Sequence, residues 1–156
     1  MRVQLGMLFL FTLMLFACKE PVKDIGAERG KNSLALLSVD RAFSQRCKTK
    51  GMKAAFIEYM DSNAVLLRPN TFPIIGANTI DYLFEQNDMD YTLSWDPQHA
   101  EVSASDDLGF TYGIYEIKPA TYDTFLYGTY TNCWKKQSDG KWKLILNTSN
   151  EGIGEH

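Results

Sequence analysis

Apolar residues recur at helical spacing through the front part of the chain. The pattern predicts a helix that begins at Asn32 or Ser33, because either side chain can accept hydrogen bonds from the first free backbone amides. Gly51 interrupts this helix. Its predicted core-facing residues are Leu34, Leu37, Ala42, Phe43 and Cys47, and its predicted water-facing residues are Asp40, Arg41, Gln45 and Arg46.

Two shorter helices and two extended segments are predicted after Gly51. Met52, Ala55, Phe56 and Tyr59 give the apolar side of a second helix that ends near Asp61. Residues 64–67 have the composition of a buried strand, and residues 72–75 form a short extended piece that stops at Gly76. A third helix is predicted over residues 78–86, with Ile80, Leu83 and Phe84 toward the core.

From Tyr91 onward the sequence is rich in aromatic and β-branched residues separated by turn formers, which is typical of antiparallel strands. Asp139 and Gly140 lie between two strands that each carry a tryptophan, a strong hairpin signal. Short helices followed by a series of strands indicate an α+β domain with the helices on one face of the sheet. The predicted strands cover residues 91–95, 99–104, 108–117, 125–135 and 142–149.

An uncharged apolar run over residues 7–17 follows the single cation Arg2 and stops at Cys18. A membrane-spanning helix needs roughly 20 apolar residues, so the run is too short to span and has the length of a signal-peptide core. The tetrad over residues 15–18 resembles the lipobox of bacterial lipoproteins. We therefore expect residues 1–17 to be removed and Cys18 to carry lipid that anchors the protein in a membrane of the cell envelope, on the periplasmic or outer-surface side. The alternative is an ordinary secretory signal with a chance cysteine.

Residues 18–30 mix charges, a proline and glycines without apolar periodicity, which predicts a flexible tether before one domain over residues 31–152. Removing residues 1–17 removes one basic and no acidic residue, which leaves 15 basic against 19 acidic residues and a net charge of −4. Nucleic-acid binding depends on clustered cations, so the sequence predicts no nucleic-acid partner.

Cys47 and Cys133 remain after Cys18 is assigned to the lipid. Export permits a disulfide between them, but each is also typical of a small buried core residue, and both alternatives stay open. Paired-cysteine spacing is absent and His156 is terminal, so no metal and no cofactor are expected. His99 follows Pro97 and Gln98 in a predicted turn and is expected to meet solvent.

The order and spacing of these segments resemble the cone-shaped NTF2-like superfamily, and within it the SnoaL-like and DUF4440-type domains. The resemblance rests on residues 51–61, the strand over 64–69, the step from Ile75 to Gly76 and the closing hairpin over 134–146. It implies three N-terminal helices packed on a curved antiparallel sheet, with a pocket between them. Such scaffolds carry many unrelated activities.

Steroid-isomerase-like members of this superfamily place a general-base aspartate at the end of the first strand and a phenol on the first helix. By the resemblance, the base position falls on Arg68 and the phenol position on Phe43 or Ser44. A guanidinium does not deprotonate and cannot be a general base, so the isomerase mechanism is not supported. Arg68 is instead a candidate ligand residue, because its planar fork suits a carboxylate or phosphate; the alternative is an arginine that pairs with a surface acid.

Three aromatic residues are candidate pocket walls, namely Trp95, Tyr112 and Trp134, although each could instead belong to the core or a dimer face. Glu116 shares a strand face with Tyr112 and is a weak candidate for a catalytic acid or base.

We expect a pocket that binds a small, largely apolar and possibly acidic molecule. The alternatives are a cyclase or isomerase with an unidentified base, and a homodimeric interaction module with a filled pocket. An open cavity above about 300 Å³ that contains Arg68 favours ligand binding.

Overall fold

A computed structural model describes residues 25–121 and 123–153. The predicted signal peptide, Cys18 and the first part of the predicted tether lie outside the described residues. Helix α1 spans Ile25–Lys50, 26 residues, and so begins well before the predicted start. Residues 25–30, expected as tether, are its first turns. They carry no apolar periodicity, so nothing in their pattern distinguished an exposed helical turn from a flexible segment.

The buried face of α1 includes the predicted Phe43 and Cys47 but not the predicted Ala42, which is exposed. Leu36, Asp40, Phe43, Ser44 and Cys47 are buried, whereas Leu34, a predicted core residue, is 65% exposed. The buried positions follow spacings of three and four residues and form one continuous stripe. Asp40, which the sequence analysis placed toward water, lies within that stripe at 0% exposure.

Two shorter helices follow α1. Helix α2 spans Met52–Tyr59, and Gly51 links it to α1 at φ 86°, in the left-handed region that glycine adopts without steric cost. Helix α3 spans Ala77–Glu85 and lies between the second and third strands, so only α1 and α2 precede the sheet. On α3, Leu83 is fully buried, as predicted, but Phe84 is 63% exposed and does not join the core.

The strands of the described chain form one six-stranded sheet in the order β2-β1-β6-β5-β4-β3. The sheet is mixed and not antiparallel as expected: β1 runs parallel to β6, with Leu66 beside Asn147. The two strands are not joined by a hairpin, so the long connection between them permits a parallel pair. The strands are β1 Met60–Leu67, β2 Ile74–Ile75, β3 Tyr91–Val102, β4 Leu108–Pro119, β5 Leu126–Lys136 and β6 Trp142–Glu151.

Strand β3 is continuous where two strands and a turn were predicted. Its pairing with β4 shifts register between Pro97 and His99, which is a bulge. Proline lacks an amide donor and is tolerated at such a position. His99 therefore lies in the sheet opposite Tyr112 and not in a turn. Because the extra residue reverses the alternation, Trp95 before the bulge and Ala100 after it face the same side.

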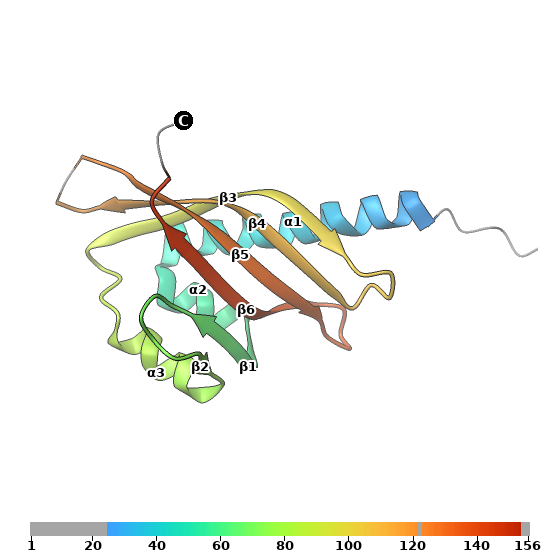
Figure 1. Cartoon of the computed structure of the whole chain (residues 1–156), viewed down its shortest axis with the longest axis horizontal. Coiled ribbons are helices and arrows are strands. Elements are labelled where there is room, and N and C mark those ends of the chain that lie inside the picture. Colours follow the sequence, from blue (N-terminus) through green and yellow to red (C-terminus); the bar gives the residue numbers. More distant parts are fainter. Residues whose placement is uncertain (1–24, 122, 154–156) are drawn as a thin grey trace, which may run out of the picture.

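Helix α1 crosses one face of the sheet against β3, while α2 and α3 lie at the end of the sheet where α1 finishes (Figure 1). The core between α1 and the sheet includes Leu36, Phe43, Trp134 and Leu144, all fully buried. None of the helices within residues 25–121 and 123–153 has the length and apolarity needed to cross a bilayer.

Candidate functional site

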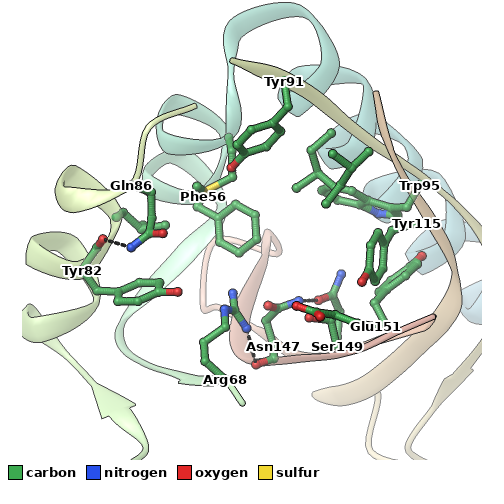
Figure 2. A pocket seen from close by; sticks show the side chains of 16 residues that line it. Phe56, Arg68, Tyr82, Gln86, Tyr91, Trp95, Tyr115, Asn147, Ser149 and Glu151 are labelled. Carbon is green, nitrogen blue, oxygen red and sulfur yellow. Dashed lines mark hydrogen bonds between the residues drawn. The ribbon is translucent and has the colours of Figure 1, made fainter. Parts of the chain in front are cut away.

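A cavity of about 190 Å³ opens between α2, α3 and the inner face of the sheet. Its wall combines aromatic and polar side chains in equal number, and the polar groups come from the ends of β1, β6 and α3 and from β5 (Figure 2). The aromatic lining residues are Phe56, Tyr82, Tyr91, Trp95, Tyr115 and Tyr130, and the polar ones are Arg68, Gln86, Asn132, Asn147, Ser149 and Glu151.

Arg68 directly follows β1 and lines this cavity, as the ligand hypothesis requires. Its Nη1 donates to the carbonyl oxygen of Leu67 at 2.9 Å and to that of Asn147 at 3.4 Å. Burial lowers the pKa of Arg68, and a hydrogen bond with the Tyr82 side chain opposes that shift. An arginine stays charged in proteins even so, and the half-buried guanidinium is therefore a fixed positive charge held against the cavity.

Asp40 is a buried carboxylate directly behind the cavity wall. Trp95 Nε1 donates to its Oδ1 at 2.8 Å, Asn132 Nδ2 to the same oxygen at 3.1 Å, and the Tyr130 hydroxyl to Oδ2 at 2.8 Å. All three donors belong to residues that line the cavity. One side chain of α1 thus orients three side chains of the wall. Burial raises the pKa of Asp40, while these hydrogen bonds to the ionised form oppose the rise.

The hydrogen-bonded network continues from Asp40 across the floor of the cavity. Asn147 Nδ2 donates to Asn132 Oδ1 at 2.7 Å, and the Asn147 carbonyl oxygen accepts from Arg68. This chain of contacts connects α1, β5, β6 and the residue after β1. This network was not predicted, because Asp40 was assigned to the polar face of α1. The spacing of four residues from Leu36 to Asp40 and from Asp40 to Ser44 was the available signal.

Of the three predicted wall residues, Trp95 alone lines the cavity. Tyr112 is 44% exposed on the opposite face of the sheet, where its ring centroid lies 5.5 Å from that of His99. Trp134 faces inward but is 0% exposed, packs edge-on against Phe43 and donates from Nε1 to Thr111 Oγ1 at 3.0 Å. These positions correct two of the wall predictions: Tyr112 is on the wrong face, and Trp134 fills the core.

Glu116 also lies away from the cavity. It shares the outer face of β4 with Tyr112, as the alternation predicted, and its Oε1 accepts a hydrogen bond from Ser94 Oγ at 2.8 Å. The cavity lining does not include it. A carboxylate on the far side of the sheet cannot reach a molecule in the cavity, so the candidate base has no access to a substrate there.

The positions that correspond to the isomerase phenol are structural in this chain. Phe43 is fully buried and stacks at 4.8 Å on Tyr59. The Ser44 hydroxyl donates to the Trp95 carbonyl oxygen at 2.6 Å and accepts from the Trp95 amide at 2.8 Å. Ser44 thereby fixes α1 to β3 and holds Trp95 in the wall.

Cys47 and Cys133 are both free thiols. Cys47 is in the core beneath α1, whereas Cys133 is half-buried on β5, on the face opposite Trp134. Burial raises the pKa of the Cys47 thiol to about 12. The two sulfurs lie on different sides of the sheet, which excludes a bridge between them in this structure.

Within the described residues, no three His, Cys, Asp or Glu side chains gather as a metal site.

No protein-family model matches the chain, and no curated protein matches it at significance. Solved structures do. A ketosteroid isomerase-like protein from Erwinia carotovora atroseptica has a TM-score of 0.62 at 13% identity, covering 78% of this chain and 97% of that one. An NTF2-like superfamily protein from Salmonella enterica has a TM-score of 0.60 at 11% identity, covering 81% and 98%.

A third similar structure, the CaMKII hub of S. rosetta, has a TM-score of 0.60 at 16% identity and covers 77% of this chain and 96% of that one. At these identities the likeness concerns the fold alone. The chain has the α+β fold of the NTF2-like proteins, with a mixed six-stranded sheet and a pocket.

Proposed function

We propose that this protein is a lipid-anchored envelope protein whose NTF2-like cavity binds a small, largely apolar molecule through an acidic group held by Arg68. The observation that carries the binding proposal is the half-buried guanidinium in the cavity wall. Charge-assisted hydrogen bonds to a carboxylate or phosphate are about twice as strong as neutral ones. The aromatic wall supplies contact area for the apolar part of the ligand.

The cavity size limits the ligand. About 190 Å³ is below the range of roughly 300 to 1,000 Å³ that is usual for drug-sized ligands. The proposal therefore concerns a small metabolite and not a steroid-sized compound. The cavity contains Arg68 but falls short of the about 300 Å³ that was expected to favour ligand binding, so the proposal depends on the guanidinium and not on the size of the cavity. The enzymatic alternative lacks its candidate base, because Glu116 faces the other side of the sheet.

The binding proposal is tested by native mass spectrometry of the purified domain, with the co-purifying compound identified after denaturation. We expect the wild-type domain to carry a small acid, Arg68→Ala to lose most of it, and Arg68→Lys to retain part of it, because lysine keeps the charge but not the planar fork. Glu116→Gln is the matched control, since it changes a charge outside the cavity. Equal recovery from wild type and Arg68→Ala would contradict the proposal.

A homodimer through the outer face of the sheet is a second proposal, which a specific observation favours. Phe110, Tyr112 and Tyr127 are between 38% and 46% exposed on this face, and His99 packs beside Tyr112. Contiguous exposed aromatic residues are typical of an interaction surface. Light scattering after gel filtration should give twice the monomer mass for wild type and the monomer mass for Tyr112→Asp. A monomeric wild type at micromolar concentration would overturn the dimer proposal.

A further inference from the structure

The two charged residues of the cavity wall have opposite signs and come from the ends of two neighbouring strands. Arg68 follows β1, and Glu151 is the last residue of β6 (Figure 2). Asn147, Ser149 and Glu151 are alternate residues of β6, and all three line the cavity, so the Glu151 side chain is directed to the same face as the other two.

Neither charge has an ion-pair partner among the residues that the structure describes. Arg68 bonds to carbonyl oxygens and Tyr82, none of which carries a full negative charge. The negative charge of Glu151 acts on the wall itself: it contributes, after burial, to a raised pKa of Tyr115.

The wall beside Glu151 suits a cation. Tyr115 and Trp95 lie on this side of the cavity, and the rings of Trp95 and Tyr130 have centroids 5.8 Å apart. Aromatic faces attract ammonium groups, and the attraction strengthens as water is excluded. The Tyr130 hydroxyl and the Trp95 indole N–H both donate hydrogen bonds to the Asp40 carboxylate. These two residues therefore present mainly their rings to the cavity.

A wall with one cation and one anion has no net charge and gives no general preference for anions over cations. A molecule that carries both charges at its two ends satisfies both groups at once. We infer that the ligand is a small zwitterion, with its acid on Arg68 and its amine between Glu151 and the rings of Trp95 and Tyr115. This inference rests on the proposed role of Arg68 and adds the second charged group of the ligand.

The test is calorimetric titration of the purified domain with three probes of equal chain length: δ-aminovalerate, valerate and n-pentylamine. The ω-amino acids from glycine to ε-aminocaproate are titrated as well, so that chain length is sampled. We expect one ω-amino acid to bind at least about tenfold more tightly than the monocarboxylate or monoamine of its length. Glu151→Gln should remove this preference without weakening the binding of valerate, because it removes a negative charge from the wall. Arg68→Gln should weaken the binding of valerate and of the ω-amino acids.

The failures of the two proposals are distinguishable. If valerate binds as tightly as the amino acids and Glu151→Gln changes neither, the zwitterion inference is overturned and the anion proposal stands. If valerate binds and no ω-amino acid does, the zwitterion inference alone is overturned. If Arg68→Gln leaves every probe unchanged, or if no acid binds, both fail. Glu151 is exposed at a strand end and its variant is expected to fold; equal thermal melting of wild type and Glu151→Gln verifies this, and Glu116→Gln is the control for loss of charge elsewhere.

Discussion

Asp40 is the residue on which the arrangement of the cavity wall depends most. Its carboxylate accepts from Trp95, Tyr130 and Asn132, and each of these donors is removed from bulk water in the folded protein. A buried donor that loses its acceptor costs about 1 to 3 kcal/mol. The wall geometry is thus coupled to the stability of the whole domain through one side chain of α1.

Asp40→Ala is expected to lower the free energy of unfolding by about 3 kcal/mol or more, because it leaves three donors unpaired. Asp40→Asn should cost less, since its amide oxygen still accepts and the Tyr130 hydroxyl can rotate to accept from its NH₂ group. Urea denaturation measures both values. Asp96→Ala is the control: this side chain is 81% exposed and pairs with Arg41 at 3.8 Å, so a change within about 0.5 kcal/mol is expected. Equal losses for Asp40→Ala and Asp96→Ala would refute the role of the network.

The free energy of unfolding should depend on pH through the raised pKa of Asp40. Burial raises the pKa of its carboxyl above the ordinary value for an aspartate, so the folded protein holds this proton more tightly than the unfolded chain. The resulting stabilisation is complete below the unfolded pKa and is lost as the pH rises through the folded pKa. We expect the stability of wild type relative to Asp40→Asn to fall as the pH rises from about 4 toward neutrality. A difference that stays constant over that range, measured by urea midpoints, would show that Asp40 has the same proton affinity in both states.

Individual site residues could be predicted from the sequence only where a single observation was enough to place the side chain. Arg68 could be identified because the resemblance places a site residue at its position, at the end of the first strand. Trp134 and Tyr112 could not be assigned, because strand alternation tells which residues share a face and not which face is covered. Asp40 was missed because charge was weighed above helical spacing, although Leu36, Asp40 and Ser44 lie in one row on the helix.

At the scale of the elements, the bulge in β3 depends on the close approach of two backbones. A Cβ atom at Gly113 would lie 2.1 Å from the Asp96 carbonyl oxygen and 3.0 Å from Pro97 Cα. Backbone atoms cannot move aside as a flexible side chain can, so the strands would have to separate. The bulge in turn brings Trp95 and Ala100 to the same face, and the cavity wall therefore depends on this approach.

Gly113→Ala is expected to destabilise the domain by about 1 to 3 kcal/mol, in the range of overpacked sites. Gly30→Ala is its matched control, because a Cβ there meets nothing within 4 Å and removes a glycine from a helix. It should be neutral or stabilising by up to about 1 kcal/mol. Thermal melting of both variants compares them directly, and a Gly113→Ala protein that melts with wild type would show that the strands separate without cost.

Element boundaries were predictable where turn chemistry and packing agreed. The hairpin at Gly140, the start of β6 and the extent of α3 were predicted to within a residue or two. The start of β1 was not: α2 ends at Tyr59 and β1 begins at Met60 with no intervening loop, so no turn residue marked the change. Pro97 indicated a turn, whereas the sheet accommodates it in a bulge.

At the scale of the molecule, the order of helices and strands was enough to predict the fold class but not the parallel pairing of β1 with β6. That pairing joins segments some eighty residues apart, and no local pattern encodes it. It nevertheless positions the site, because it brings Arg68 next to the Asn147 carbonyl oxygen at the edge of the cavity.

Lipid attachment is tested on the full chain expressed in a bacterium. Wild type should be found in the membrane fraction and should incorporate a labelled fatty acid, whereas Cys18→Ser should incorporate none, because the thiol is the site of alkylation in the lipobox. Cys133→Ser, which removes a thiol from the described domain, should behave as wild type. Labelling of the Cys18→Ser protein would contradict the assignment.

The length of α1, 26 residues, bears on how far from a membrane the cavity would meet its ligand. At 1.5 Å per residue the helix is roughly 39 Å long, and the cavity lies beside its C-terminal half, where Asp40 binds wall residues and Met52 and Phe56 of the following α2 form part of the wall. On the proposal that Cys18 carries lipid, the opening of the cavity would be held away from the headgroups, in the aqueous compartment. Solutes that diffuse through that compartment, such as amino acids, reach the opening directly, whereas a compound dissolved in the bilayer would first have to leave it.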